Sequence, residues 1–415
     1  MSGCRIITRK DGYILSALVQ DGRVVELHPQ ADCVETRPVV GDIYIGKVRN
    51  VVKNIGAAFV EFAKGQMGYL SLHEYETCTI HTQGRVYQEG RVLIGDEIFV
   101  QVSREAVKTK PPTLSGKLDF TGRYMVLSVG KTGNSVSKKI MDQELRSHLQ
   151  ELMDACKISQ GGWTARTNCA GASDEEIRQE MESLEEKCRR MLEQDIHKGP
   201  FYAVSKAPEG FLADLRDGYD SQTDQILTDE EDLHQRIHAY MEEYMPAQLH
   251  KLALWPEGHG KLSVVYNVDR TLEHALMPKV WLKSGAYLVI QPTEALVSID
   301  VNSGKAVSKK RDIQETYTRI NQEAACEIAY QLRVRNLSGM ILVDFIDMKD
   351  KQAGEELLQT LRREVKKDHV PTTVVDMTRL GLVEMTRKKT TASLWEQIQR
   401  VRKEQQHEQE KGTQS

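Results

Sequence analysis

Two acidic side chains end apolar, β-branched segments of the sequence. Asp300 and Asn302 end one such run, and Asp344 follows another, residues 341–343. Both runs predict buried strands. An ionised carboxylate at the end of a buried strand is costly unless something pairs with it, and two carboxylates together repel, which raises a pKa or recruits a cation. Oxygen ligands favour Mg2+ or Mn2+ over zinc, so these residues predict a magnesium site. The alternative is that each Asp forms a turn or caps a helix.

The sequence between these runs should place the two strand ends side by side. Residues 311–335 carry apolar side chains at three- and four-residue steps, which predicts a helix, and Gly339 follows as a stop signal. A strand, a long crossover and a second strand imply parallel neighbours with a right-handed connection. A second predicted helix, 353–367, leads to a third strand, 372–376. Parallel α/β sheets bind ligands at the carboxyl ends of their strands, where both aspartates fall.

Basic residues accompany both carboxylates along the sequence. A metal ion that activates water, with cations that hold the backbone, suits cleavage of a phosphodiester. A solvated basic face is the alternative. The clusters are Lys305, Lys309, Lys310 and Arg311 after the first strand, and Arg387, Lys388 and Lys389 near the end. Weaker candidates for a metal or supporting role are Asp347, Asp376 and Glu384.

The composition is that of an ordinary soluble globular protein, and its length allows two to four domains. The formal charge of −4 means that nucleic-acid binding would have to come from local patches. No apolar run approaches the length of a membrane span, and no signal peptide opens the chain. The 7 cysteines form no C-x-x-C pair and are odd in number, which argues against a disulfide framework and a cysteine zinc site. We therefore expect a cytoplasmic protein.

Residues 38–116 contain many short predicted strands, typical of a small Greek-key barrel of the OB type. The two-residue period places Leu70 and Leu72 inside the barrel. Phe59 and Tyr69 then lie on its polar face, where they could form a stacking platform for single-stranded bases. The alternative is that a neighbouring domain covers these rings. Lys110 could add a phosphate contact.

Residues 117–205 predict a separate α/β segment, with strands near 122–127 and 162–167 and a capping box at Ser173 that opens a long charged helix. Arg166 and the Thr167 hydroxyl, with loop amides, could hold one phosphate, although an ordinary surface arginine is the alternative. Residues 1–37 predict short strands with Asp-Gly hairpin turns that join a sheet formed later, with strands of 206–280.

Several motifs together resemble the ribonuclease E/G family, over roughly residues 1–395. They are Asp300-Val301-Asn302-Ser303; Glu315-Thr316 with Asn321 and Glu323-Ala324-Ala325; Val343-Asp344-Phe345-Ile346-Asp347-Met348; and Arg379-x-Gly381-Leu382-x-Glu384-Met385-x-Arg387. The resemblance implies a multidomain α/β fold. An S-one-type OB-fold barrel (38–116) and a 5′-sensor region (117–205) would be inserted into an RNase H-like subdomain (1–37 and 206–280). A DNase I-like catalytic subdomain (281–395) and a polar tail (396–415) would follow.

The resemblance also implies an activity and a set of site residues. The activity is Mg2+-dependent endonucleolytic cleavage of single-stranded RNA, such as rRNA precursors and mRNA, to 5′-phosphate and 3′-hydroxyl ends. Asp300 and Asp344 would hold the metal, and Asn302 would hydrogen-bond to Asp300 or to the scissile phosphate. The implied RNA contacts are Phe59, Tyr69 and Lys110, and the implied 5′-monophosphate pocket comprises Gly122, Val126, Arg166 and Thr167. A non-catalytic RNA-binding factor is the competing interpretation, and a metal phosphoesterase for small molecules is a third.

The sequence departs from the family pattern at two places. An arginine that the family uses in its 5′-end pocket falls here near Pro371, and Arg379 is the candidate to replace it. No C-P-x-C pair follows Arg387, so we expect no zinc link between subunits and leave open whether the protein forms a homo-oligomer.

Overall fold

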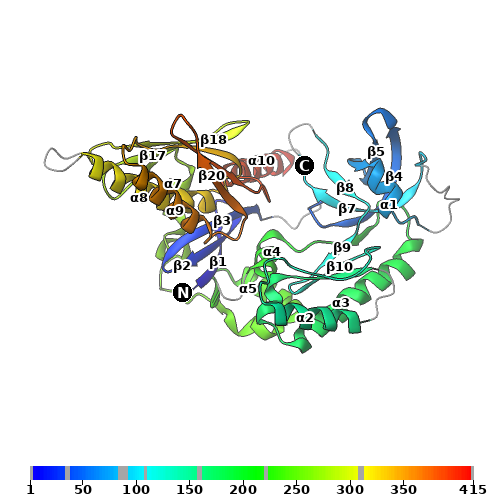
Figure 1. Cartoon of the computed structure of the whole chain (residues 1–415). Coiled ribbons are helices and arrows are strands. Elements are labelled where there is room, and N and C mark those ends of the chain that lie inside the picture. Colours follow the sequence, from blue (N-terminus) through cyan, green and yellow to red (C-terminus); the bar gives the residue numbers. More distant parts are fainter. Residues whose placement is uncertain are drawn as a thin grey trace. The chain divides into compact units, whose positions relative to one another are not determined.

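The computed structural model describes residues 3–32, 38–82, 92–106, 110–156, 161–218, 223–306 and 313–412. Its contacts divide the chain into two compact units (Figure 1). The first comprises Met1–Asp32, Ser221–His238 and His250–Ser415, and the second comprises Cys33–Asp220 and Ala239–Leu249. The chain therefore begins in the first unit, forms most of the second, and returns.

The first unit contains a mixed sheet that carries both candidate aspartates. Its strand order is β16 (Lys279–Trp281), β17 (Tyr287–Pro292), β18 (Leu296–Asn302), β19 (Gly339–Asp344), β21 (Leu382–Arg387), β20 (Thr372–Met377). The predicted crossover is confirmed, since α8 (Ile313–Val334) joins β18 to its parallel neighbour β19. The predicted third strand, β20, is present but is separated from β19 by the antiparallel strand β21.

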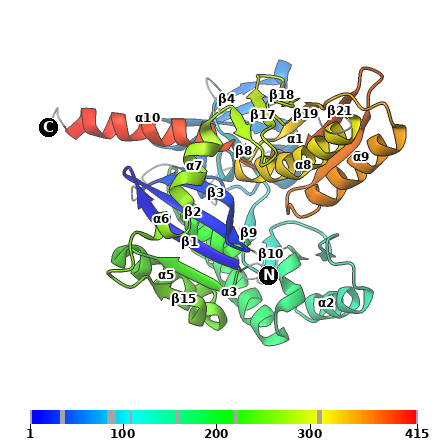
Figure 2. The same cartoon turned by 90° about the vertical axis from the view of Figure 1, so that its left-hand side faces the viewer.

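One face of this sheet is buried and the other is open. Val297, Ile299 and Val301 alternate with exposed or half-exposed residues along β18, as the two-residue period of a half-buried strand requires. The buried face packs on α8 and α9 (Lys351–Val365), which lie side by side (Figure 2). The strands predicted as buried are therefore buried on one face only, because these helices cover one side of the sheet.

The same unit contains a second sheet, which the N-terminal strands build. Its order is β15 (Leu252–Leu254), β14 (Gln225–Thr228), β1 (Gly3–Lys10), β2 (Tyr13–Gln20), β3 (Arg23–Ala31). Asp11-Gly12 and Asp21-Gly22 form the hairpin turns, and all four have positive φ, as type I′ turns need. The pairing of β1 with β14 confirms that the N-terminal strands join a later segment. The helices packed here are α6 (Leu262–Val265), α7 (Val268–Leu276), the end of α8 and the start of α10 (Leu394–Gly412).

The second unit contains the predicted five-stranded barrel. Its strands are β4 (Ile43–Val52), β5 (Ala57–Ala63), β6 (Gln66–Ser71), β8 (Thr113–Ser115) and β7 (Glu97–Arg104), and pairing of β4 with β7 closes it. The short strand β13 (Ala203–Ser205) adds to β4. Leu70 is buried in the barrel as expected, but Leu72 is only half-buried because β6 ends at Ser71 and α1 (Leu72–Cys78) begins there.

A four-stranded sheet completes the second unit. Its order is β11 (Ser135–Val136), β12 (Gly162–Ala165), β10 (Met125–Ser128), β9 (Asp119–Thr121). It packs on α2 (Gln143–Ala155) and α3 (Asp174–Glu193), which Figure 1 shows along one side of β9 and β10. The predicted capping box opens α3, with Ser173 and Glu176 as its members. Helix α4 (Gly210–Asp217) also belongs to this unit, whereas α5 (Glu231–Tyr244) is divided between the two units. None of the described helices has the length and apolar character that a membrane span requires.

Candidate functional sites

Asp300 and Asp344 are direct partners on the parallel strands β18 and β19. Both side chains are exposed on the open face of the sheet, opposite the buried Ile299 and Val343. The Asn302 side-chain amide lies two residues further along β18 and donates a hydrogen bond of 2.6 Å to the Asp300 carboxylate. Two carboxylates and an amide therefore gather at the carboxyl ends of the only parallel pair among the described strands of this sheet.

Two reasons were expected for a cation at this pair, burial and mutual repulsion, and only repulsion fits the structure. Because Asp300 and Asp344 are exposed, burial does not force them to acquire a partner. Their proximity alone favours a cation, since neighbouring carboxylates repel. Among the described residues, no three His, Cys, Asp or Glu side chains gather as a metal cluster. Two carboxylates fit Mg2+, which keeps several waters and is bound through one or two carboxylates plus substrate phosphates.

A buried amide on α8 positions the loop that follows Asp344. Asn321 is fully buried, its amide nitrogen donates to the Ile346 carbonyl at 2.7 Å, and its amide oxygen accepts the Ile346 N–H at 3.1 Å. Both polar groups of one side chain thus fix the backbone two residues after the aspartate. Asn321 was noted only as part of a motif. Its place on the apolar stripe of the helix, between Ile320 and Ala324, was the signal for a structural role.

The expected basic cluster near the end of the chain does not flank the carboxylates. β21 runs antiparallel to β19, so Arg387 pairs with Gly339, while Asp344 pairs with Leu382. Five residues of strand, about 17 Å, separate Arg387 from the aspartates. The prediction that Arg387 lies beside the carboxylates is therefore wrong.

The Arg387 guanidinium has a structural role instead. It is buried and donates to the Asp368 carboxylate at 2.7 Å, to the Asn336 amide oxygen at 2.8 Å and to the Leu337 carbonyl at 2.9 Å. The exposed Lys388 and Lys389 follow it at the same end of the sheet.

The other predicted basic and acidic residues have varied surroundings. Lys305 is exposed in the turn after β18, whereas Lys309, Lys310 and Arg311 lie outside the described residues. Glu384 is exposed opposite Leu342, on the same open face as the aspartates. Asp347 is exposed in the loop after β19, and Asp376 lies on the edge strand β20, where its carboxylate accepts the Met377 N–H at 2.8 Å.

The two aromatic residues of the barrel meet on its outer surface. Phe59 on β5 pairs directly with Tyr69 on β6, and their rings make an edge contact with centroids 6.3 Å apart. Both are partly exposed, while Ala58, Val60 and Leu70 fill the interior. Lys110 is exposed three residues before Thr113, which pairs with Tyr69.

The four residues of the predicted phosphate pocket converge at one corner of the β9–β12 sheet. The Arg166 guanidinium donates to the Gly122 carbonyl, and the Arg166 N–H donates to the Tyr124 carbonyl at 2.7 Å. Val126 lies two residues along β10 from this contact. Thr167 follows Arg166, and its hydroxyl lies 3.3 Å from the Ser137 hydroxyl.

A half-buried carboxylate holds the turn of this corner. Glu180 of α3 accepts the N–H groups of Arg123, Tyr124 and Met125 at 2.5, 2.7 and 2.7 Å. Burial raises the pKa of Glu180, although the three N–H groups act to lower the pKa. A side chain at Gly122 would meet the Glu180 carboxylate at 2.4 Å, so the close approach requires glycine. Glu180 was not predicted, although an acidic residue on the apolar face of α3, between buried Ile177 and Leu184, was the available signal.

A second carboxylate, also not predicted, engages the pocket arginine. Asp217 at the end of α4 accepts a hydrogen bond of 2.8 Å from Arg166 and another of 2.9 Å from Arg216. Burial opposes the charge on Asp217, but these arginines outweigh it and hold its pKa below the usual value. The guanidinium that would contact a phosphate is thus already bound to an anionic group.

Comparison with known proteins gives a consistent result. Residues 119–390 match the model of the "Ribonuclease E/G family". The chain is 33% identical to "Ribonuclease G" of Haemophilus influenzae, covering 91% of this chain and 78% of that protein. It is 31% identical to "Ribonuclease G" of Escherichia coli with the same coverage. It is also 31% identical to "Ribonuclease E" of a Nostoc species, over 86% of this chain and 52% of that protein.

Proposed function

Because the chain belongs to the ribonuclease E/G family and is an endoribonuclease, we propose that it hydrolyses single-stranded RNA at Asp300 and Asp344 with Mg2+. The products would carry 5′-phosphate and 3′-hydroxyl ends. The observation that carries this proposal is the direct pairing of two exposed carboxylates at neighbouring strand ends. A protein that only binds RNA has no use for two adjacent negative charges, which repel the phosphate backbone unless a cation neutralises them.

Some residues of the site would bind the metal ion, and others orient the residues that bind it. Asp300 and Asp344 would hold Mg2+, with Mn2+ as the substitute, and a bound divalent ion supplies an activated water and stabilises charge on the phosphate. Asn302 holds the Asp300 carboxylate through its amide and keeps one oxygen free to turn toward the ion. Asn321 fixes the loop after Asp344 and so limits how far that carboxylate can move.

The barrel would supply RNA affinity that does not depend on sequence. Bases stack on aromatic faces whatever their identity, and the outward rings of Phe59 and Tyr69 offer such a surface. Lys110 would contact a phosphate at the same strand edge. The two rings meet edge to face, so they do not stack on each other.

The corner around Arg166 would receive the 5′-monophosphate of the RNA. The guanidinium would contact phosphate oxygens, the Thr167 hydroxyl would add a donor, and Gly122 and Val126 would shape the pocket. The phosphate would compete with Asp217 for the guanidinium, so binding would exchange one anion for another. The role of Arg379 as a further phosphate ligand stays a prediction.

The subdomain assignments expected from the resemblance are part of the same proposal. They are an RNase H-like subdomain, an S-one-type barrel, a 5′-sensor and a DNase I-like catalytic subdomain, with the boundaries given above. We propose cytoplasmic RNA processing and decay, on rRNA precursors and mRNA, and no zinc link between subunits should the protein form a homo-oligomer.

One experiment tests the proposal. A short single-stranded RNA bearing either a 5′-phosphate or a 5′-hydroxyl is incubated with the protein, with and without Mg2+. We expect cleavage only with Mg2+ and faster cleavage of the 5′-phosphorylated RNA. RNA that binds but stays intact under both conditions would favour the non-catalytic RNA-binding factor, and equal rates for the two RNAs would refute 5′-end sensing alone.

A further inference from the structure

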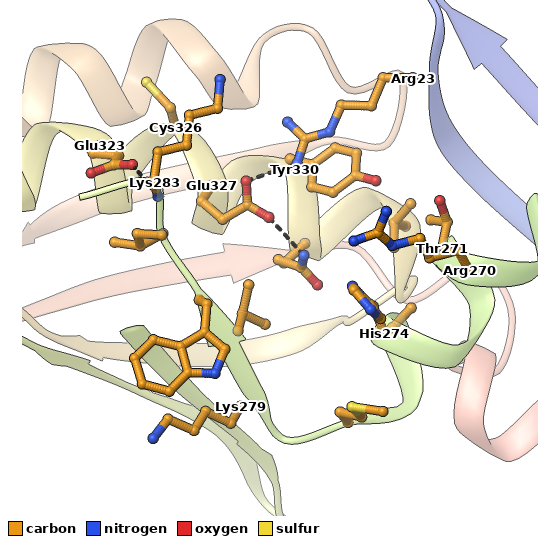
Figure 3. Close-up of a pocket in the computed structure, with 17 residues that line it drawn as sticks. Arg23, Arg270, Thr271, His274, Lys279, Lys283, Glu323, Cys326, Glu327 and Tyr330 are labelled. Atoms are coloured by element: carbon orange, nitrogen blue, oxygen red, sulfur yellow. Dashed lines mark hydrogen bonds and ion pairs between the residues drawn. The ribbon is translucent and has the colours of Figure 1, made fainter. Parts of the chain in front are cut away.

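The first unit contains a cavity that none of the residues above explains. It has a volume of about 600 Å³ and lies between α7, β16 and α8, with Arg23 from the start of β3 at its rim. Figure 3 shows Arg270 and His274 extending from α7 toward its middle, while the Lys283 side chain runs beside Cys326. Neither candidate aspartate lines it. Its size falls within the range of pockets that bind small molecules.

The cavity has an excess of positive charge. Arg270 and His274 are one helical turn apart and therefore share a face of α7. Within the described part of the chain, no carboxylate is in ion-pair contact with Arg270 or Lys283. The Arg270 guanidinium and the Lys283 ammonium are therefore available to an anion.

The acidic residues of the cavity are already engaged by other donors. Glu327 accepts hydrogen bonds from Arg23 at 2.8 Å and from the Gln331 amide at 2.7 Å. Glu323 accepts the backbone N–H groups of Lys283 at 2.7 Å and Ser284 at 3.3 Å. These carboxylates are thus bound to local donors. An anionic ligand could therefore contact Arg270 and Lys283, which no carboxylate neutralises directly.

The cavity also offers an aromatic surface. Trp281 lines it with 61% of its surface exposed, which is unusual for so large an apolar ring. The ring is held in place, because the Lys279 ammonium lies 4.2 Å from its centroid and the Tyr287 ring lies 5.2 Å away. Buried or half-buried Ala275, Val280 and Leu282 continue the apolar wall. A planar ring would bury apolar area here.

We propose that this cavity binds a nucleoside phosphate, with the phosphate at Arg270 and His274 and the base against Trp281. A cationic end and a fixed aromatic surface in one pocket match the two ends of such a ligand. The ligand is either a free nucleotide or one nucleotide of an RNA strand, and the chemistry of recognition is the same. This site is separate from the proposed cleavage site, and its binding does not depend on cleavage.

Calorimetric titration with 5′-AMP tests the proposal, and every protein compared, including the otherwise wild-type one, carries Arg166→Ala so that the proposed 5′-monophosphate pocket does not contribute. We expect saturable binding, with affinity at least about tenfold weaker in Arg270→Ala and in Trp281→Ala. The matched control is Arg189→Ala, an exposed arginine of α3 in the other unit, which should bind as the wild type does. Inorganic phosphate should bind more weakly than 5′-AMP because it lacks the base.

Further arms separate the two sources of the nucleotide. In the background of Arg166→Ala and Asp300→Asn, which removes the proposed 5′-monophosphate pocket and cleavage, weaker binding of single-stranded RNA in Arg270→Ala and competition by 5′-AMP would assign the site to the RNA strand. Unchanged RNA binding with retained 5′-AMP binding would assign it to a free nucleotide. The proposal is overturned if 5′-AMP does not bind, if phosphate alone binds equally well, or if Arg189→Ala weakens binding as much as Arg270→Ala.

Discussion

Replacing Asp300 with asparagine tests the metal pair most directly. The change removes one negative charge and preserves the shape of the side chain. The amide oxygen of the introduced side chain could still accept the hydrogen bond that Asn302 now donates at 2.6 Å. We therefore expect cleavage to be lost, while RNA binding and folding are kept.

The expected effect on stability can be worked out from the exposed, in-register geometry. Neighbouring strands lie about 4.8 Å apart, and two charges about 4 Å apart in water repel by about 1 kcal/mol. Relief of this repulsion stabilises the variant, and loss of the charged acceptor for Asn302 costs a similar amount. Without metal, the free energy of unfolding should thus change by no more than about 1 kcal/mol.

Adding Mg2+ should produce a difference in stability between the wild type and Asp300→Asn. At about ten times its dissociation constant, Mg2+ should stabilise the wild type by about 1.4 kcal/mol through mass action, whereas Asp300→Asn should gain almost nothing. Urea denaturation with and without Mg2+ measures this, independently of RNA cleavage. Asp21→Asn is the control, because Asp21 is exposed in the turn between β2 and β3, where asparagine also accepts positive φ, and it should respond to Mg2+ as the wild type does.

Two results would refute the reasoning. Normal cleavage by Asp300→Asn would show that the pair does not hold the catalytic ion. A loss of more than about 2 kcal/mol without Mg2+ would show that the carboxylate is structural, since this exceeds what an exposed side chain contributes.

Four further substitutions test other parts of the structure. Phe59→Ala should weaken binding of single-stranded RNA by about 1–3 kcal/mol, measured by fluorescence anisotropy, and an unchanged dissociation constant would exclude a stacking role. Asp217→Asn frees the pocket guanidinium and should tighten binding of 5′-phosphorylated RNA by up to about fivefold, with 5′-hydroxyl RNA as the control. Glu180→Gln places an amide donor against a backbone N–H and should lower the free energy of unfolding by about 1–3 kcal/mol. It should also reduce the preference for 5′-phosphorylated RNA. A variant with full stability would contradict the role of Glu180 in positioning the turn. Arg387→Met leaves the buried Asp368 carboxylate without its guanidinium and should lower the free energy of unfolding by about 3–5 kcal/mol. The control, Lys388→Met, should change the free energy of unfolding by less than about 0.5 kcal/mol. If Arg387→Met keeps full stability but binds RNA more weakly, Arg387 has a phosphate-binding role instead.

Local patterns predicted the elements whose geometry depends on neighbouring residues. Asp11-Gly12 and Asp21-Gly22 specify their turns because few residues accept positive φ. The outward placement of Phe59 and Tyr69 follows from the two-residue period of a strand. These features depend on dihedral preferences and burial within a few residues, so they could be read directly from the sequence.

The pairing of Asp300 with Asp344 was predictable because a strand, a helix and a strand have essentially one connection. The open face of the sheet was not predictable, because the packing of all the elements decides which face the helices cover. Arg387 shows the same limit, because insertion of the antiparallel β21 beside β19 places it at the far end from the aspartates.

The sequence by itself determined the strands, the barrel, the acidic and aromatic residues of the proposed sites and the family to which they point. Only the tertiary structure decided which charges became neighbours: Glu180 with the turn it holds, Asp217 with Arg166, and Arg270 with the cavity beside Trp281. The physical reason is that a residue's type sets its charge and its local backbone preference. Its partners are set by strand order and helix packing, which arise from contacts among segments far apart in the chain.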